Sequence, residues 1–303
     1  MKNLQDLCYG IVGLGLMGGS LGKAIRQNIL VKGSKGKILG SDINASSLSL
    51  AKEQNICDDT FSIEQVDSML AECDFVYICL YPHATLKFLN DHKTYFRNDS
   101  IITDISGVKS FMQAEISSFN SVLQEKNVDF ILGHPMAGGE KEGYSNSLGT
   151  IFNNHNYILV PQEYNKKENI ELFKNLIYKL GFTHIVETSS LQHDHKIAFT
   201  SQLCHVIASA LVNSAEDCNI TEFGGGSFED LTRIAMINAP LWTELFLSNK
   251  SELLNHIDSF EKSLSSIKQL IKNDDAEALT SYLTDVRIKR ISMNSNKSEK
   301  SVF

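Results

Sequence analysis

The chain has 303 residues, of which 42% are hydrophobic and 21% are charged, and its formal net charge is −8. This length favours two domains, and the composition is that of a globular protein, which excludes a disordered or fibrous chain. The acidic balance argues against nucleic-acid binding, because that function needs a basic face. A small anionic substrate is still compatible with it, since a site can be locally positive.

Three features of the sequence indicate a cytoplasmic protein outside the membrane. The first long apolar run, residues 8–20, is interrupted by five glycines and is shorter than the roughly 20 residues of a membrane span. The N-terminal sequence MKNLQDL lacks the basic-then-apolar layout of a signal peptide. The six cysteines include no CxxC pair, and several lie in apolar runs. We therefore predict reduced thiols and no metal site.

The first half of the chain alternates short apolar runs with longer helical stretches. Most of these runs are apolar throughout, which suits strands buried on both faces of a parallel sheet. The alternation predicts a Rossmann-type, doubly wound α/β domain over residues 1–188. The predicted strands are 8–13, 37–42, 74–79, 101–104, 130–133, 157–160 and 183–186, and the helices between them include 20–28, 45–54 and 167–180.

Helical patterns replace the β-branched runs in the second half of the chain. They predict helices over 191–212 and 251–272, and an all-α substrate and dimerisation domain over 189–291. The apolar residues of the second helix recur at alternating steps of 4 and 3, a seam that fits an intrachain bundle or a dimer interface. The polar tail 292–303 is predicted to be disordered. The seam consists of Leu253, Ile257, Phe260, Leu264, Ile267 and Ile271.

A GxGxxG sequence, residues 13–18, lies directly after the first predicted strand and before a helix. In this context Gly13 permits a tight turn, Gly15 lets the backbone approach a pyrophosphate, and Gly18 lets the helix pack close to the sheet. The helix N-terminus then holds the phosphates. The cofactor contacts predicted in this turn are Gly13, Gly15, Leu16, Met17 and Gly18.

An aspartate, Asp42, ends the second predicted strand. A carboxylate at this place accepts hydrogen bonds from the ribose hydroxyls and repels a 2′-phosphate. The sequence therefore favours NAD over NADP.

Three further groups of polar residues narrow the chemistry. His134 follows the fifth predicted strand, where a doubly wound fold places residues at the cofactor crevice, and a neutral imidazole there can accept a proton.

Asp194, Ser201 and His205 share one face of an apolar helix, which predicts either a polar cavity or a buried, hydrogen-bonded histidine. Arg233 follows a glycine run, and its carboxylate partner is a neighbouring acid such as Glu229 or Asp230, or a substrate.

The motifs in this order resemble the prephenate dehydrogenase family, the oxidative enzymes of tyrosine biosynthesis. The HPMAG and TRIA…P.LW sequences are specific to that family, whereas the glycine fingerprint is not. The matching segments are GLGLMGGSLG (13–22), TDISGVKS (103–110), GHPMAGGEKEG (133–143), HDHKIAFTSQLCH (193–205) and FEDLTRIAMINAPLWTELFLSN (228–249).

The resemblance implies a nicotinamide-binding domain, a helical domain that forms a homodimer, and an active site in the cleft between them. It implies that prephenate and NAD give 4-hydroxyphenylpyruvate, CO2 and NADH. Loss of hydride from ring C4 and of CO2 from C1 makes the ring aromatic, and this drives the reaction.

The resemblance also implies roles for individual residues. His134 corresponds to the histidine that accepts the proton of the C4 hydroxyl, and Arg233 to the arginine that binds a substrate carboxylate. His205 and Glu140 are expected to line or gate the substrate site. Asp104 is expected near the nicotinamide.

The chain departs from the family pattern at two places. The usual loop serine is replaced by Gly107, and we expect Ser106 to take over as a catalytic residue. In the helix motif Gln202 stands where a histidine is common, and we expect it to contact substrate. The family's proline is also absent, which predicts a regular helix there because Cys204 keeps its backbone N–H.

Three alternative functions stay open at this point. An arogenate dehydrogenase differs only in the substrate side chain. Another β-hydroxyacid-type dehydrogenase would use a catalytic lysine in the region of Lys196, although the motif spacing differs. An NAD-binding regulatory or scaffold protein would keep the fold without turnover.

Overall fold

The computed structural model describes residues 3–298. Contacts between residues divide the chain into two compact units, Met1–Lys250 and Ser251–Phe303. The predicted domain boundary at 188/189 differs from this division and stays a prediction. No helix within the described residues has both the length and the apolar character of a membrane span.

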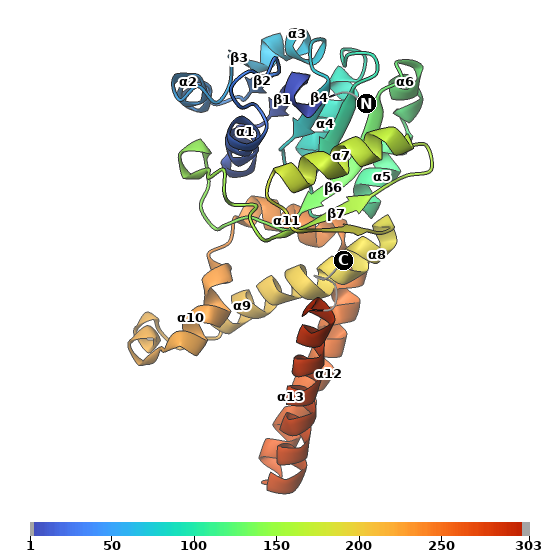
Figure 1. The fold of residues 1–303 in the computed structure, drawn as a ribbon. Helices are drawn as coiled ribbons and strands as arrows, with labels where there is room; N and C mark the ends of the chain where they lie inside the picture. Colours follow the sequence, from blue (N-terminus) through green and yellow to red (C-terminus); the bar gives the residue numbers. More distant parts are fainter. Residues whose placement is uncertain (1–2, 299–303) are drawn as a thin grey trace. The chain divides into compact units, whose positions relative to one another are not determined.

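An eight-stranded sheet organises the first unit, in the order β3-β2-β1-β4-β5-β6-β7-β8 (Figure 1). Neighbouring strands are parallel except for β6 and β7, which are antiparallel and make the sheet mixed rather than fully parallel. The short edge strand β3 was not predicted, because its three residues DTF form no apolar run. The strands are β1 (Cys8–Val12), β2 (Lys37–Ser41), β3 (Asp59–Phe61), β4 (Phe75–Ile78), β5 (Ile101–Asp104), β6 (Asp129–Pro135), β7 (Asn156–Val160) and β8 (His184–Glu187).

Helices cover both faces of the sheet, so that the central strands are buried on two sides and read as continuous apolar runs. The helices α1 (Leu16–Asn28), α2 (Ala45–Glu53) and α7 (Lys167–Lys179) bury their apolar residues on one face. The other face is covered by α3 (Val66–Leu70), α4 (Pro82–His92), α5 (Ser110–Ser117) and α6 (Asn120–Glu125). The strand order reverses between β1 and β4, and in doubly wound folds ligands bind at the carboxyl ends of the strands at such a point.

Four helices follow β8 within the first unit: α8 (Ser190–Ile197), α9 (Leu203–Asn213), α10 (Gly226–Thr232) and α11 (Ala239–Ser248). Between α8 and α9 the backbone forms a π-helical turn over Ala198–Gln202, in which the N–H of Leu203 donates to the carbonyl of Ala198. The prediction of a regular helix here is therefore wrong. A missing proline permits α-helical hydrogen bonding but does not enforce it, and π turns are frequent at functional sites.

The second unit is a pair of long helices, α12 (Lys250–Lys272) and α13 (Ala276–Ser298). Within the predicted seam of α12, Leu253 is buried whereas Leu264 and Ile271 are exposed. Helix α13 continues to Ser298, so the prediction of disorder from residue 292 is wrong for 292–298. Residues 299–303 lie outside the described residues.

Candidate active site

The glycine turn after β1 has the shape that a pyrophosphate requires. Gly13 has a φ of +90°, and a Cβ there would lie 2.6 Å from the carbonyl oxygen of Cys79. A Cβ on Gly18 would collide with the carbonyl oxygen of Gly13, whereas the Cβ position of Gly15 has no heavy atom within 4 Å. The open space thus lies at the N-terminus of α1, where free backbone N–H groups attract an anion. These residues fit a dinucleotide.

Asp42 lies directly after β2, beside this turn. Its Oδ2 accepts the N–H of Leu14 at 2.6 Å, and its Oδ1 accepts the N–H of Asn44 at 2.7 Å. The carboxylate is half-buried and held in one orientation. Each oxygen keeps a second lone pair with which to accept a ribose hydroxyl.

The loop after β5 is anchored by a buried ion pair. Asp104 and Lys109 are both fully buried, and Lys109 Nζ lies 2.7 Å from Asp104 Oδ2. The carboxylate also accepts the N–H groups of Ser106 and Gly133. Burial lowers the pKa of Lys109, although the neighbouring Asp104 opposes the shift. Asp104 is therefore buried and shapes the loop, and its expected place near the nicotinamide stays a prediction.

A chain of hydrogen bonds connects this loop to His134. The carboxylate of Asp194, on α8, accepts the backbone N–H groups of Lys109 and Ser110 at 2.8 Å each. The same carboxylate lies 2.7 Å from His193 Nδ1. His193 Nε2 in turn lies 2.9 Å from His134 Nδ1. The structure thus brings Asp194, His193 and His134 into one line, with His134 at its outer end.

The surroundings of the two histidines keep them neutral. Burial lowers the pKa of His134 well below its ordinary value, and the nearby His193 and Lys109 add to the effect. Burial also lowers the pKa of His193, while its hydrogen bond to Asp194 acts in the opposite direction. Burial works to raise the pKa of Asp194, but the hydrogen bonds from His193 and the backbone outweigh it, so this pKa is lowered. An ionised Asp194 thus faces two neutral imidazoles.

The serine expected to assist His134 lies elsewhere. Ser106 Oγ is buried and has no hydrogen-bond partner, so it does not bond to His134. Gly107 is the nearer position, because a Cβ built on it would lie 3.8 Å from His134 Cε1 and 3.2 Å from Leu245 Cδ2. The expectation that Ser106 replaces the family serine is therefore not supported by its contacts, since the side chain of residue 106 does not reach the ring.

Helix α9 and helix α11 position the second histidine. The ring of His205 stacks on Trp242, with centroids 3.5 Å apart and an interplanar angle of 28°. Its Nδ1 lies 2.9 Å from the carbonyl oxygen of Ser201, which can only accept, so Nδ1 carries the hydrogen and Nε2 is an acceptor. Burial lowers the pKa of this imidazole. His205 is thus a fixed, neutral group that can accept a hydrogen bond.

Gln202 has a structural role. It is buried, its Nε2 donates to the carbonyl of Leu245 at 3.0 Å, and its Oε1 accepts from Asn249 Nδ2 at 2.9 Å. Both ends of the amide therefore have protein partners, and the expected contact of Gln202 with substrate stays a prediction. The side-chain amide of Gln202 thus connects the π turn to the C-terminal end of α11 through hydrogen bonds.

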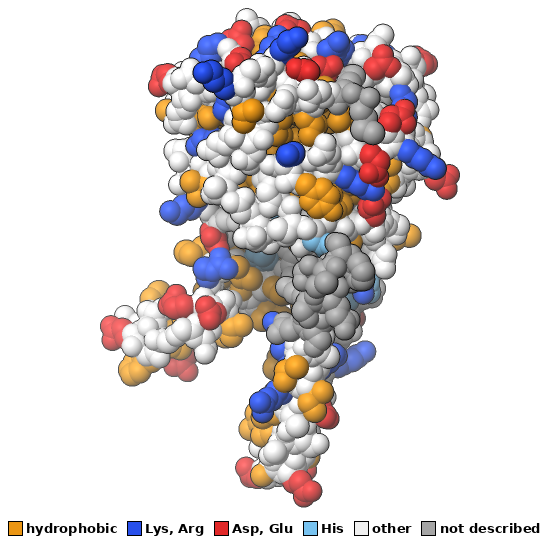
Figure 2. Space-filling model, viewed as in Figure 1, with side chains coloured by type: hydrophobic (Ala, Val, Ile, Leu, Met, Phe, Trp, Pro, Cys, Tyr) orange, Lys and Arg blue, Asp and Glu red, His pale blue; other side chains and the backbone are white. Residues whose placement is uncertain are grey.

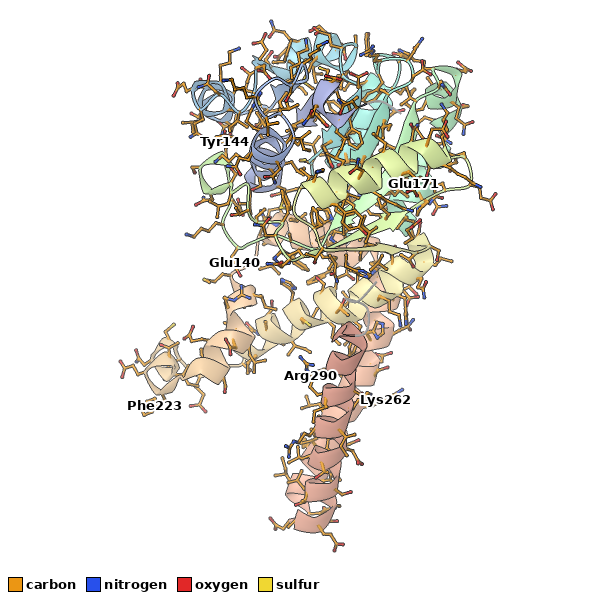
Figure 3. The ribbon with its side chains drawn as sticks, viewed as in Figure 1. Glu140, Tyr144, Glu171, Phe223, Lys262 and Arg290 are labelled. Atoms are coloured by element: carbon orange, nitrogen blue, oxygen red, sulfur yellow. The ribbon has the colours of Figure 1, made fainter. Side chains whose placement is uncertain are left out.

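The loop after β6 reaches the helices through two contacts. The guanidinium of Arg233 pairs with the carboxylate of Glu140, which Figure 3 labels on this loop. Glu142 on the same loop accepts a hydrogen bond from Asn238 at 2.6 Å, and Asn238 also donates to the hydroxyl of Tyr81. The partner of Arg233 is thus Glu140 and neither of the adjacent acids. Because 59% of the Arg233 side chain is exposed, a substrate carboxylate can reach it.

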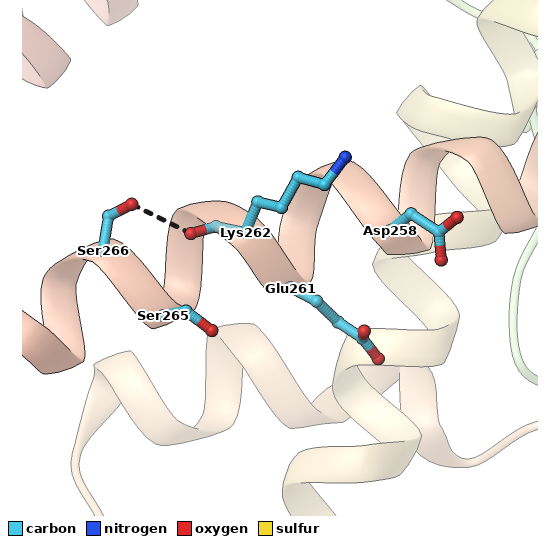
Figure 4. A pocket seen from close by; sticks show the side chains of 5 residues that line it. All are labelled: Asp258, Glu261, Lys262, Ser265 and Ser266. Carbon is cyan, nitrogen blue, oxygen red and sulfur yellow. Dashed lines mark hydrogen bonds between the residues drawn. The ribbon is translucent and has the colours of Figure 1, made fainter.

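A separate hollow lies along α12 in the second unit (Figure 4). Its lining comes from one exposed stretch of a single helix, and Ser266 donates a hydrogen bond to the carbonyl of Lys262 there. It contains none of the predicted site residues. The lining residues are Asp258, Glu261, Lys262, Ser265 and Ser266.

Two family models match most of the chain. The model described as prephenate dehydrogenase, nucleotide-binding domain, matches residues 21–186, and the model of the prephenate dehydrogenase dimerization domain matches residues 189–285. The chain belongs to the prephenate dehydrogenase family. Both the Rossmann-type fold and the resemblance read from the sequence are thereby confirmed.

Individual relatives agree with this assignment. The chain is 30% identical to prephenate dehydrogenase from Bacillus subtilis, over 93% of this chain and 74% of that protein. It is 26% identical to cyclohexadienyl dehydrogenase from Zymomonas mobilis, over 94% and 96% respectively. The crystal structure of prephenate dehydrogenase from A. aeolicus in complex with hydroxyphenyl propionate and NAD+ matches with a TM-score of 0.84 and 32% identity, covering 96% of this chain and all of that one.

Two residues of this prephenate dehydrogenase family site escaped the sequence interpretation. His193 begins the HDH sequence and lies outside the helical stripe of Asp194, Ser201 and His205, so the stripe does not predict it. Trp242, the sole tryptophan of the chain, lies in the last matching motif, which predicts no role for it. A signal was available for His193, since a histidine beside a buried aspartate is a frequent orienting pair. The stacking of Trp242 on His205 depends on tertiary packing.

Proposed function

We propose that the chain catalyses the NAD-dependent oxidative decarboxylation of prephenate to 4-hydroxyphenylpyruvate, the oxidative step of tyrosine biosynthesis. The observation that carries the proposal is the partly buried imidazole of His134, whose pKa is lowered and whose Nδ1 is bonded to His193, so that Nε2 can act as a base. It lies near the carboxyl end of β6, in a fold whose first turn fits a dinucleotide. The names of the relatives from B. subtilis and A. aeolicus support the same reaction.

The residues of the chain perform the proton chemistry in this proposal. Nicotinamide, when bound, supplies the hydride acceptor. His134 Nε2 accepts the proton of the C4 hydroxyl as hydride leaves C4, and the C1–carboxylate bond then breaks and releases CO2. The electron pair of that bond enters the ring and reaches the C4 oxygen. His134 returns its proton to this oxygen, so the phenol forms and the imidazole is neutral again.

Substrate binding is assigned to the helices beyond β8. Arg233 binds one carboxylate of prephenate as a bidentate partner, which requires Glu140 to move away from the guanidinium or to share it. His205, held by Trp242 and the Ser201 carbonyl, offers an acceptor to a hydroxyl group. Asp42 binds the ribose of NAD and disfavours the 2′-phosphate of NADP.

Arogenate is the second candidate substrate. Its side chain carries an ammonium group where prephenate has a keto group, and the carboxylate of Glu140 beside Arg233 offers such a cation a partner. Steady-state assays of both substrates, each with NAD and with NADP, test the proposal. We expect prephenate with NAD to give the highest kcat/KM, and failure to oxidise either substrate would refute the proposed function.

We also propose that the protein is a cytoplasmic homodimer. Several apolar side chains of α9, of α10, of the segment between them and of the turn after α10 are exposed, and orange surface lies there in Figure 2. Phe223 is 91% exposed and Met236 is 67% exposed, which is costly in water without a partner. Light scattering is expected to give twice the chain mass, and Phe223→Asp is expected to shift the mass toward the monomer. The exposed residues are Leu211, Val212, Ile220, Phe223, Leu231 and Met236.

A further inference from the structure

For the two hydrogen bonds of His193, only one assignment of donor and acceptor atoms is possible. An ionised carboxylate can only accept, so the Nδ1 of His193 that lies 2.7 Å from Asp194 carries the hydrogen. In a neutral imidazole the other nitrogen is then an acceptor. His193 Nε2 therefore accepts from His134 Nδ1 across 2.9 Å, and the free nitrogen of His134 is Nε2. The tautomer of His134 thus follows from the charge of Asp194, two residues along the chain of bonds.

We infer that His193 and Asp194 are positioning residues that hold His134 in the tautomer whose Nε2 accepts the substrate proton. This inference rests on the proposed function, in which His134 is the base. In this inference the carboxylate of Asp194, the ring of His193 and the ring of His134 form one hydrogen-bonded series, with the base at its outer end. When His134 is protonated, its Nδ1–H still donates to His193, and the added charge faces the carboxylate of Asp194 through one ring.

The inner end of the series is held rigidly. Both oxygens of Asp194 accept backbone N–H groups, from Lys109 and Ser110 at the start of α5. The carbonyl of Asp194 accepts a hydrogen bond from Asn249. Lys109 itself is held by its buried ion pair with Asp104. The carboxylate therefore cannot turn without breaking two hydrogen bonds to α5, and this fixes the ring plane of His193.

The contacts of His193 are not those of a histidine that merely fills the core. Its side chain is fully buried, and each ring nitrogen faces another titratable group. Residue 107 offers His134 no alternative partner, because it is glycine, and Ser106 Oγ does not reach the ring. His193 thus supplies the hydrogen bond that orients the base.

Two substitutions at one position separate the positioning role from simple packing. His193→Gln keeps an acceptor near the place of Nε2, whereas His193→Leu keeps volume and loses it. We expect kcat to fall about 100-fold in the leucine variant and about 10-fold or less in the glutamine variant, with KM for substrate little changed. His155→Gln is the matched control, because the side chain of His155 is exposed and its backbone hydrogen bonds join it to Phe152 and Thr183.

The pH profile gives a readout that packing alone would not change. The charged and titratable groups around His134 are His193 from α8 and Lys109 from the loop before α5, with Asp194 and Asp104 behind them. Both variants remove the His193 ring, whose proximity is one of the causes that lower the pKa of His134. The acidic limb of kcat/KM is therefore expected to move to higher pH in both variants.

The tautomer itself can be observed without turnover. In wild-type protein labelled with 15N-histidine, NMR is expected to find His134 protonated at Nδ1 and not at Nε2. The inference is overturned if His134 is the Nε2–H tautomer, or if both variants retain wild-type kcat and an unmoved acidic limb. It is also overturned if glutamine and leucine cause equal losses that follow melting temperature. If the wild type oxidises neither substrate, the proposed function fails alone, and the NMR result still decides the tautomer.

Discussion

The glycine turn after β1 and the hydrogen-bonded series Asp194–His193–His134 are the two halves of the proposed site, and they are built in different ways. The turn is local, since six consecutive residues define its shape and two of them tolerate no side chain. The series is assembled from α8, β6 and the loop before α5, with partners up to 85 positions apart. A turn formed by consecutive residues can be predicted from sequence, and only substitutions within it change its shape. A network formed by distant residues can lose its function through substitutions at positions that contact no ligand.

The largest effect is expected from removing the base. His134→Ala deletes the group that accepts the hydroxyl proton, so kcat should fall by about 10² or more. Binding of NAD depends on the glycine turn and should persist. Stopped assays with prephenate, together with NADH titration followed by the fluorescence of Trp242, measure the two quantities. An unchanged kcat would contradict the assignment of the base.

Substitution of Arg233 should weaken the binding of substrate without changing the binding of the cofactor. Arg233→Ala removes the guanidinium that we assign to a substrate carboxylate, and a charge-assisted hydrogen bond is worth about 1.5–3 kcal/mol. We therefore expect KM for prephenate to rise by about 10- to 100-fold, with KM for NAD unchanged. Glu140→Gln is the paired variant, and it should lower KM if Glu140 competes with substrate for Arg233. A rise in the KM for NAD in either variant would argue against this division.

Two alanines in the glycine turn should act differently although they lie three positions apart. In Gly18→Ala the new Cβ collides with the carbonyl oxygen of Gly13, so the melting temperature should fall by several degrees, in line with a loss of about 1–3 kcal/mol. Gly15→Ala meets no protein atom and should leave stability unchanged while it raises KM for NAD. Calorimetry and steady-state kinetics measure both effects. Equal melting temperatures for the two variants would show that the turn is not as tight as described.

The difference between a turn of consecutive residues and a network of distant residues also explains which features the sequence could predict. The strands of the sheet, the turn and Asp42 follow from local patterns, and the position of His134 follows from the fold rule for strand ends. The burial of Asp104 and the use of Gln202 did not follow, because each depends on partners far away in sequence, such as Asn249 for Gln202. The antiparallel pairing of β6 and β7 was missed for the same reason. An apolar run indicates a buried strand, but not the direction of its neighbour.

The smallest effect is expected in the pH dependence of the wild-type enzyme. This pH dependence directly tests the hydrogen-bonded series that ends at His134. Burial and neighbouring charge hold the pKa of His134 well below the ordinary histidine value of about 6.5. A base with a lowered pKa stays unprotonated as the pH falls, so kcat/KM should stay flat down through pH 6.5 and decline only at lower pH. His155→Gln should give the same profile. An acidic limb at or above pH 6.5 in the wild type would mean that the free enzyme stabilises the imidazolium, which is not expected for a partly buried ring with a lowered pKa.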